Sequence, residues 1–365
     1  MKIVIVGCGV VGAAIAYELS LIQGLQITVI DQNQPASGST GAALGILMGA
    51  ISHKKKGRAW QLREASLRRY ETLIPELEEK TSIQIPVNRQ GIVKLLFEDE
   101  ILEKWQKLRK FRQKTGWELE IWDSAELQHK CPQINQEKII AAVYSPQDRQ
   151  IHPRKLTEAL VAGATQNGVE FRFGVRCGRP MVKSPNGSKH CYQLQSDRDT
   201  IDLDYLIISA GLGSTPFTTS LQAEIPIRPV LGQALKLKLH RDLGNINFQP
   251  VITGNDIHLV PLGEGQYWLG ATVEFPDDTG EVTAQAELLE QVKHDAIAFC
   301  PALADATVLE TWSGKRPRPE GIAAPVIGQL SGYNNVLLAT GHYRNGVLLA
   351  PATALQIKQA LNIYH

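Results

Sequence analysis

The chain has 365 residues, 43% of them hydrophobic and 21% charged, so it can build the core of two domains or of one large α/β unit with an insertion. Lys and Arg number 38 against 37 Asp and Glu, which gives no reason to expect nucleic acid or an anionic membrane as the main partner. The five cysteines form no C-x-x-C pair and the histidines no H-x-x-x-H pair. We therefore expect reduced thiols, no metal site and a cytoplasmic protein. No stretch approaches the ~20 apolar residues of a transmembrane helix.

The N-terminal region predicts a β-α-β unit. A short buried strand at residues 2–6 is followed by a glycine turn, a helix over 11–23 and a second strand over 26–30. This order implies parallel strands joined by a right-handed crossover. The glycines at 7, 9 and 12 interrupt the apolar run that follows Lys2, which argues against a signal peptide.

The turn reads Gly7-Cys8-Gly9-Val10-Val11-Gly12, a G-x-G-x-x-G pattern between strand and helix. Its glycines allow a tight turn, close approach of the backbone to a pyrophosphate, and close packing of helix on strand. The helix N-terminus offers N–H groups and partial positive charge to the phosphates. Asp31 ends the second strand, where an acid can accept hydrogen bonds from ribose hydroxyls. The pattern predicts a bound dinucleotide; the alternative is a tight turn without a ligand.

The turn alone does not separate FAD from NAD. The hydroxyl-rich loop at Ser39 and Thr40 favours FAD because it could reach pyrophosphate or ring atoms, unless it only caps a helix. Further elements are predicted along the rest of the chain: helices over 60–79, 101–113, 153–167 and about 348–361, strands over 169–175, 192–195, 200–209 and 336–340, and mostly strand over 228–272. The basic helix at 101–113 and the run at 53–56 are interpreted as solvated surface.

The Rossmann-like pieces lie at the start, middle and end of the chain, with alternating strands between them from about 217 to 320. We therefore predict an α/β fold in which an FAD-binding Rossmann-like domain is interleaved with an antiparallel-sheet α+β substrate-binding domain. The FAD-binding domain would comprise residues 1–82, 150–216 and 325–365, and the substrate-binding domain residues 83–149 and 217–324.

The C-terminal segment 341–353, Gly-His-Tyr-Arg-Asn-Gly-Val-Leu-Leu-Ala-Pro-Ala-Thr, resembles the signature of the glycine oxidases of thiamine biosynthesis. These enzymes belong to the D-amino-acid oxidase and sarcosine oxidase superfamily. The resemblance covers nearly the whole chain and includes the segments 39–45, 229–233, 269–272 and 312–317. It implies an FAD-dependent amino-acid oxidase. It also implies non-covalent FAD, because only Cys300 lies in the C-terminal third, where relatives with a cysteine-linked flavin carry the linkage, and it matches no such motif.

The resemblance assigns a set of residues to FAD: Gly7, Gly9, Val10, Val11, Gly12, Asp31, Gln32, Ser39, Thr40, Leu44, Gly45, Ile46, Val175, His342, Tyr343, Arg344, Asn345, Gly346, Val347 and Leu348. The turn at 342–348 again joins a strand to a helix N-terminus. Its backbone N–H groups would suit the electron-rich pyrimidine edge of a reduced flavin.

Arg316 and Arg344 match the arginines that contact the substrate in relatives. A guanidinium holds a carboxylate in a bidentate pair that lysine cannot reproduce; taken alone, either arginine could instead be a surface residue. His258 stands where relatives carry a tyrosine that can donate to the substrate carboxylate. Histidine can also donate, although it is shorter and its charge depends on pH; the alternative is a strand residue with a satisfied ring. Leu231 replaces a basic residue of many relatives.

These features predict oxidative deamination of a small amino acid by hydride transfer to flavin, with molecular oxygen as acceptor. Glycine, sarcosine, a small D-amino acid or a cyclic imino acid would fit, and the products would be a 2-oxo acid, ammonia and hydrogen peroxide. No catalytic side chain is assigned, because positioning and the flavin supply most of the catalysis. Two alternatives remain: a D-amino-acid dehydrogenase that reduces a quinone or another acceptor, and a catalytically silent flavin-binding partner protein. Relatives often self-associate, so a homo-oligomer is left open.

Overall fold

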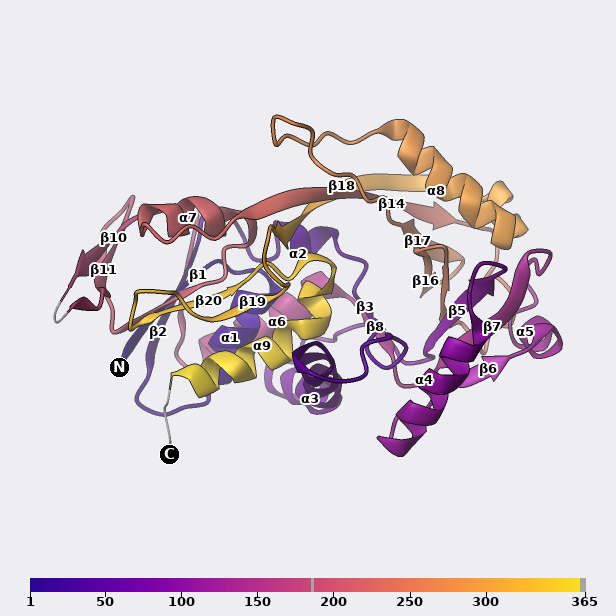
Figure 1. Ribbon diagram of the computed structural model, residues 1–365, viewed down its shortest axis with the longest axis horizontal. Coiled ribbons are helices and arrows are strands. Elements are labelled where there is room, and N and C mark those ends of the chain that lie inside the picture. Colours follow the sequence, from indigo (N-terminus) through magenta and orange to yellow (C-terminus); the bar gives the residue numbers. More distant parts are fainter. Residues whose placement is uncertain (185–186, 362–365) are drawn as a thin grey trace.

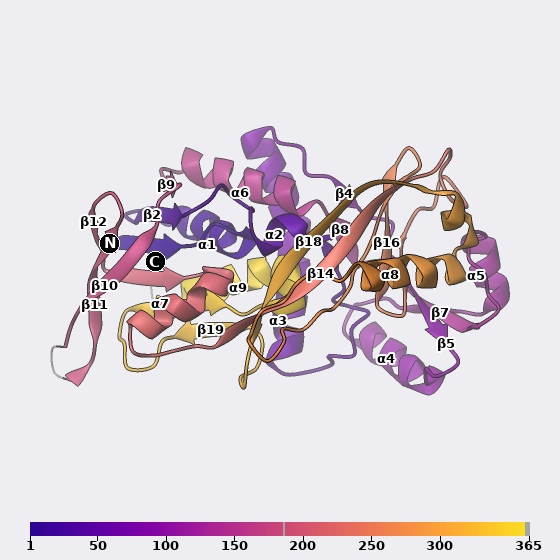
Figure 2. The same cartoon turned by 90° about the horizontal axis from the view of Figure 1, so that it is seen from above.

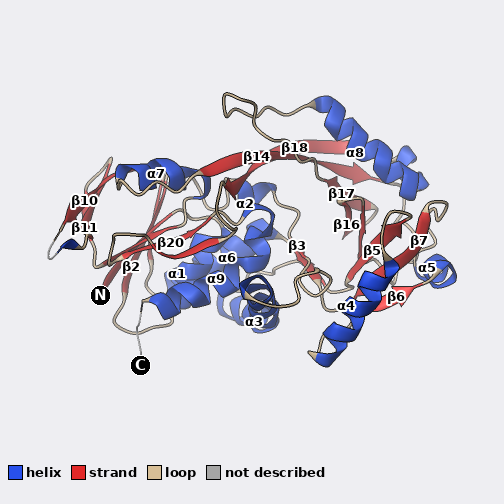
Figure 3. Cartoon of the chain, in the orientation of Figure 1, coloured by secondary structure: helices blue, strands red, loops and turns tan. Residues whose placement is uncertain are grey.

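Two large sheets organise the part of the chain that the computed structural model describes, residues 1–184 and 187–361 (Figure 1). The six-stranded sheet has the order β19-β20-β13-β1-β2-β9, and the eight-stranded sheet has the order β18-β14-β17-β16-β15-β5-β7-β6. We call each sheet with its covering helices the six-stranded half and the eight-stranded half. Figure 3 shows helices gathered beneath the first sheet and along the outer side of the second.

The six-stranded sheet is parallel except for its edge strand β19. Its strands are β1 (Lys2–Val6), β2 (Gln26–Asp31), β9 (Glu170–Phe173), β13 (Tyr205–Ile208), β19 (Val326–Gln329) and β20 (Val336–Thr340). The central strands are almost wholly buried, as expected for parallel strands covered on both faces. Because parallel strands end at one edge of the sheet, the turns after β1, β2 and β20 meet there.

Four helices cover one face of this sheet: α1 (Val10–Ser20), α3 (Arg58–Thr81), α6 (Pro153–Gln166) and α9 (Gly346–Ala360). Small side chains such as Ala13 and Ala16 line α1 and are fully buried, so neighbouring helices can approach it closely. The other face carries α7 (Ser214–Ser220) and a cluster that contains Val175 and Phe217. Helix α1 ends three residues earlier than predicted, in a turn at 21–24 where Gly24 has a φ of +80°.

The eight-stranded sheet turns one face to helices α5 and α8, and its other face packs on helix α4 (Leu102–Lys114) over β5 and β7 and faces the first half elsewhere. Its strands are β5 (Ile92–Phe97), β6 (Glu120–Trp122), β7 (Ile139–Ser145), β14 (Ile227–Lys238), β15 (Val251–Gly254), β16 (Ile257–Gly263), β17 (Gln266–Gly270) and β18 (Thr307–Pro319). Helices α5 (Ser124–Lys130) and α8 (Ala286–Phe299) cover the outer face. On the inner face Leu44, from the first half, packs with Ala234 and Val260. Seen from above, the paired strands β14 and β18 run between the two halves (Figure 2).

Shorter elements connect and flank the two halves. They are α2 (Ser39–Ala42), α4 (Leu102–Lys114), the sheet of β3 (Ile46–Leu47), β8 (Arg149–Ile151) and β4 (Val87–Asn88), the sheet of β10 (Cys177–Lys183), β11 (His190–Ser196) and β12 (Thr200–Asp202), and the 3-10 turns η2 (Gly211–Gly213), η3 (Pro301–Asp305) and η4 (Tyr343–Asn345).

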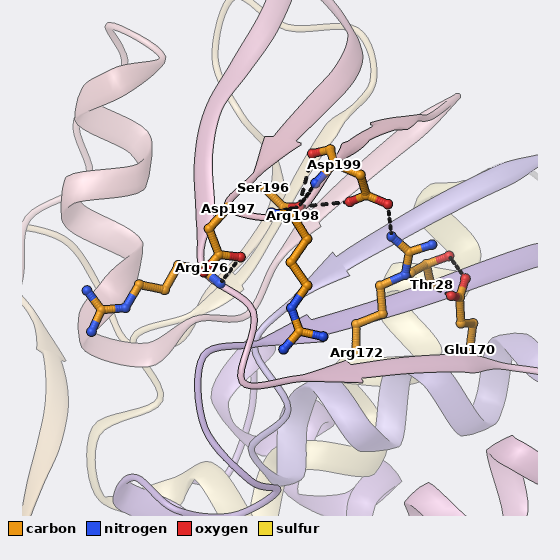
Figure 4. Close-up of polar contacts among 8 residues, drawn as sticks. All are labelled: Thr28, Glu170, Arg172, Arg176, Ser196, Asp197, Arg198 and Asp199. Carbon is orange, nitrogen blue, oxygen red and sulfur yellow. Dashed lines mark hydrogen bonds and ion pairs between the residues drawn. The ribbon is translucent and has the colours of Figure 1, made fainter.

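A polar network joins the edge strand β9 to the turn between β11 and β12 (Figure 4). Arg172 of β9 pairs with Glu170 and Asp199, each at 2.8 Å, and Ser196 donates to Asp199 at 2.8 Å. These groups are exposed or half-exposed, so each pair adds little stability by itself. Together they hold the sheet of β10, β11 and β12 beside β9. Val175 follows β9 directly, and its N–H donates to the Asp31 carbonyl at 3.1 Å.

The predicted α/β fold is confirmed, but one local prediction is wrong and another was incomplete. The single strand expected over 200–209 is divided between two sheets, because β12 pairs with β11 whereas β13 pairs with β1. Residues 83–149, for which only a helix was predicted, also supply β5, β6 and β7. The division into domains stays a prediction. The six-stranded sheet takes its strands from 2–31, 170–208 and 326–340, and residues 362–365 of the predicted FAD-binding domain lie outside the described residues.

None of the helices in residues 1–184 and 187–361 is both long and apolar enough to cross a membrane. Within the same ranges, no group of three His, Cys, Asp or Glu side chains is placed to hold a metal ion.

Candidate active site

The turn after β1 requires glycine at two of its three glycine positions for reasons of backbone geometry. Gly7 has a φ of +101°, and a Cβ there would lie 2.6 Å from the Ser209 carbonyl oxygen. A Cβ on Gly12 would lie 1.9 Å from the carbonyl oxygen of Gly7, so any side chain would force α1 away from β1. A Cβ on Gly9 would meet only the Thr40 hydroxyl, at 3.1 Å. Apart from that hydroxyl, the space beside the Cα of Gly9 is open within 4 Å of such a Cβ.

Asp31 holds the same turn from the neighbouring strand. Its Oδ2 accepts a hydrogen bond from the N–H of Cys8 at 2.7 Å, and its Oδ1 accepts from the N–H of Asn33 at 2.8 Å. Each carboxylate oxygen keeps a further lone pair for a ribose hydroxyl. The sequence had suggested only the ribose contact. The neighbouring Gln32 is exposed at the same strand end.

The segment at 39–46 joins this turn to the inner face of the eight-stranded sheet. Thr40 accepts a hydrogen bond from the N–H of Val10 at 3.0 Å, and Ser39 donates to the carbonyl of Lys315 at 2.6 Å. The Gly45 carbonyl accepts from the N–H of Ile151 at 3.0 Å, and Ile46 pairs with β8. Two segments that carried the family resemblance, 39–45 and 312–317, therefore contact each other.

Two helix N-termini face the edge where β1 and β20 end. Helix α1 starts after Gly9 and α9 after Asn345, and neither N-cap side chain accepts a hydrogen bond from its helix. The first-turn N–H groups of a helix lack acceptors within the helix, and they carry partial positive charge. Both helices follow parallel strands of one sheet, so these ends point to the same side. The two ends fit FAD, which presents a pyrophosphate and an electron-rich pyrimidine edge.

The turn before α9 has a rigid backbone. Tyr343 has a φ of +53°, in the left-handed region that non-glycine residues seldom adopt and that is common at functional sites. His342 is 4% exposed, and its Nε2 lies 2.9 Å from the hydroxyl of Thr353. That hydroxyl donates to the carbonyl of Leu349, so His342 must donate from Nε2. Burial, and secondarily the charge of Arg58, lowers the pKa of His342 to about 3 and keeps it neutral.

The two arginines expected at the substrate come from adjoining elements: β18, which carries Arg316, contacts the η4 turn, which carries Arg344. Arg316, on β18, donates from Nη1 to the carbonyl of Leu231 at 2.9 Å and lies against Gly232, where a Cβ would be 2.1 Å from its Nη2. Burial lowers the pKa of Arg316, and the positive charge of Arg344 lowers it further. Leu231, which replaces a basic residue of relatives, thus holds Arg316 through its backbone. The side chain of Arg344 is 35% exposed, so it forms the outer member of the pair.

His258 lies within the electrostatic influence of the same two arginines. Its Nδ1 is 2.9 Å from the hydroxyl of Thr253, its cross-strand partner on β15. Burial lowers the pKa of His258 to about 4, with the charge of Arg344 as the second cause and that of Arg316 a smaller one. His258 is therefore neutral near pH 7. When Thr253 donates to Nδ1, the ring proton lies on Nε2, which becomes a hydrogen-bond donor.

Sequence reasoning missed three groups at this site: Thr253, Gly232 and Asp256. Asp256 lies 3.3 Å from Arg344 and two residues before His258, so its closeness to His258 along the chain was visible in the sequence. Thr253 and Gly232 carry no such signal, because their roles depend on which strands pair. The residues predicted to bind FAD lie in the turns that follow β1, β2 and β20 and in the segment 39–46. Val175 lies beside Asp31.

The FAD dependent oxidoreductase model of the DAO family matches residues 2–360. The chain belongs to this family. This confirms the predicted flavoenzyme with FAD as its cofactor, and similarity to glycine oxidases confirms the predicted resemblance. The chain is 26% identical to the glycine oxidase of Bacillus licheniformis, over 96% of this chain and 90% of that protein. It is 29% identical to the bifunctional protein ThiO/ThiG of Synechocystis over 98% of this chain. The chain spans about half the length of the ThiO/ThiG proteins that it matches (51% in that case).

Solved structures support the fold. The glycine oxidase of Bacillus cereus superposes with a TM-score of 0.86 over 100% of this chain and 96% of that one, at 24% identity. The L-proline dehydrogenase of P. horikoshii superposes with a TM-score of 0.83 over 98% and 93%, at 21% identity. Assignment of single residues to cofactor or substrate stays a prediction.

Proposed function

We propose that this flavoenzyme oxidatively deaminates a small amino acid, such as glycine, sarcosine or a small D-amino acid. One observation carries the proposal: β18, which carries Arg316, contacts the η4 turn, which carries Arg344, and the charges of both arginines act on the neutral His258. Two adjacent guanidinium groups are suited to one planar carboxylate. The similarity to proteins named glycine oxidase supports the same substrate class.

In this proposal the arginines bind and orient the substrate carboxylate. His258 donates a further hydrogen bond from Nε2, in place of the tyrosine of relatives. Because His258 is neutral, it adds no third positive charge beside the arginines. The amine arrives neutral, so no side chain acts as a base. Bound FAD would supply the hydride acceptor for the Cα–H and pass the electrons to molecular oxygen.

The overall reaction balances with one water and one oxygen molecule. The amino acid loses a hydride and a proton to become an imino acid, and water hydrolyses that product to a 2-oxo acid and ammonia, or methylamine in the case of sarcosine. Oxygen takes up the two electrons and two protons as hydrogen peroxide. A link to thiamine biosynthesis, a cytoplasmic location and self-association are further parts of the proposal.

The chain's own residues would hold FAD without a covalent bond. The N–H groups at the start of α1, with Thr40, would bind the pyrophosphate, and Asp31 would accept from the ribose. The N–H groups at the start of α9 would lie at the pyrimidine edge of the flavin. Cys300 is buried behind the eight-stranded sheet, in the cluster under α8, which supports non-covalent binding.

The test is anaerobic reduction of the FAD-loaded protein by a panel of small amino acids, read from the flavin absorbance near ~450 nm. We expect bleaching by at least one of glycine, sarcosine and small D-amino acids, and reoxidation by air with release of peroxide. Arg344→Ala should lower kcat/KM, because the substrate carboxylate loses a charged bidentate contact. The loss should correspond to about 2–5 kcal/mol of transition-state binding. Arg179→Ala is the matched control: it removes an exposed arginine of β10, in the separate three-stranded sheet, and should change kcat/KM little.

Other results would point elsewhere. A yellow protein that no amino acid bleaches would contradict the proposal and favour the silent flavin-binding protein. Bleaching followed by turnover with a dye under nitrogen, but not with air, would favour the dehydrogenase. An unchanged kcat/KM in Arg344→Ala would remove the arginine pair from substrate binding.

A further inference from the structure

The carboxylate of Asp256 lies beside Arg344, the outer arginine of the proposed substrate site. Strands β15 and β16 form a hairpin in which Gly254 pairs with Ile257, so only Asn255 and Asp256 make the loop. Both loop residues have positive φ, +48° and +62°. A two-residue loop with two positive φ angles is typical of a type I′ turn, which matches the twist of the strands and holds its residues firmly. Asp256 is therefore fixed at the hairpin tip.

Asp256 joins the two halves through Arg344. Its Oδ2 lies 3.3 Å from Nη1 of Arg344, which belongs to η4 of the six-stranded half. The two side chains are 74% and 35% exposed, so the pair lies at the open, solvent side of the site. Arg316, by contrast, donates to the backbone of β14, and within residues 1–184 and 187–361 no carboxylate forms an ion pair with it.

Asp256 also acts on His258. Asp256 is the last residue of the turn and His258 is the second residue of β16, so the two lie two positions apart along the chain. The negative charge of Asp256 raises the pKa of His258, against the larger effects of burial and Arg344. One carboxylate thus lies in the field of both the outer arginine and the histidine, where a substrate carboxylate would bind.

We propose that Asp256 is a specificity-determining residue whose carboxylate competes with the substrate carboxylate for Arg344. This inference rests on the proposed function. A substrate must share Arg344 or displace Asp256, so Asp256 weakens the binding of every monocarboxylate. It also repels a second carboxylate near the site mouth, so it disfavours dicarboxylic substrates relative to neutral ones. Because an exposed ion pair contributes little, we expect its removal to strengthen carboxylate binding about fivefold.

The experiment uses FAD-loaded wild type, Asp256→Asn and Glu264→Gln. Asparagine keeps the turn, because it tolerates positive φ, and removes the charge. Glu264 is an exposed acid in the next hairpin turn, at the other end of β16 and roughly 25 Å along the strand, so its substitution changes the net charge equally. Acetate is the probe: it is titrated against the flavin absorbance, which reports binding without turnover.

We expect the Kd of acetate to fall about fivefold in Asp256→Asn and to stay at the wild-type value in Glu264→Gln. The gain should shrink as salt rises, since the competing pair is exposed. In turnover, KM should fall with kcat unchanged, and the ratio of kcat/KM for D-aspartate to that for D-alanine should rise. An equal Kd in wild type and Asp256→Asn, or an equal gain in Glu264→Gln, would overturn this inference alone. If acetate bound neither wild type nor Asp256→Asn, the arginine site and with it the proposed function would be wrong.

Discussion

Asp148 should be one of the most costly side chains to remove from this protein. It is fully buried, and its carboxylate accepts three backbone hydrogen bonds from residues 49–51, each 2.8 Å long. Arg112 holds the same segment from the other side. It is also fully buried and donates to the carbonyls of residues 50, 52 and 54 at 2.7 to 2.9 Å, while its guanidinium lies 3.5 Å from the ring centre of Trp60. The segment follows β3 directly, so these contacts fix the chain next to the predicted cofactor loop.

The expected cost follows from what Asp148→Ala leaves behind. Three N–H groups lose their acceptor, and the buried Arg112 loses the nearby negative charge that raises its pKa, which burial has lowered to about 10. Removing one partner from a buried charge network costs about 3–5 kcal/mol, a large share of a typical 5–15 kcal/mol stability. Asp148→Asn keeps one acceptor oxygen, so it should cost less, about 1–3 kcal/mol.

Urea unfolding of the FAD-loaded protein measures these losses. Trypsin supplies a local readout, because the segment leads into Lys54, Lys55, Lys56 and Arg58. We expect faster cleavage there in Asp148→Ala at urea concentrations where the rest of the protein stays folded. Asp278→Ala, which removes an exposed aspartate, should stay within about 0.5 kcal/mol of wild type. Asp148→Ala within about 1 kcal/mol of wild type, with an unchanged cleavage pattern, would refute the reasoning.

Three further outcomes are expected. Gly12→Ala should abolish FAD binding, because its Cβ would lie 1.9 Å from the Gly7 carbonyl oxygen. The ratio of flavin absorbance to protein absorbance measures the bound FAD. Gly38→Ala is the control, because a Cβ at Gly38 meets nothing within 4 Å. The unfolding free energy should fall as pH drops from about 6.5 towards about 4, because His258 and His342 stay neutral in the folded protein but take up protons in the unfolded chain. Each histidine should contribute up to about 1.4 kcal/mol per pH unit. His258→Gln should flatten that slope in urea titrations at pH 7 and 5, and an equal slope would contradict the pKa assignment. Thr253→Val should weaken acetate binding by about 0.5–1.5 kcal/mol, since His258 loses the partner on Nδ1 that favours a donor at Nε2; unchanged binding would remove His258 from the site.

Much of the nucleotide-binding turn could be predicted from the sequence because its parts are local. Strand, glycine turn, helix and Asp31 all lie within the first 31 residues, and the physical demands of such a turn leave few residue types at Gly7 and Gly12. The segment 341–353 is similarly contiguous, and the family model confirms the membership that it indicated. The boundaries were less predictable: the split between β12 and β13 depends on which sheet each strand joins.

The substrate side of the site was decided by tertiary structure. Arg344 and Asp256 are 88 residues apart in the chain, and Arg316 and Leu231 are 85 apart. Even the nearby pair of Thr253 and His258 exists only because β15 and β16 pair in one register; a slip by one residue would turn one of the side chains to the other face. The sequence by itself determined the cofactor turn and the family, whose signals are short and contiguous. Strand register and the packing of the two halves bring Arg316, Arg344 and Asp256 to the proposed substrate site. No local sequence pattern encodes either of them, because the contacts join residues far apart in the chain.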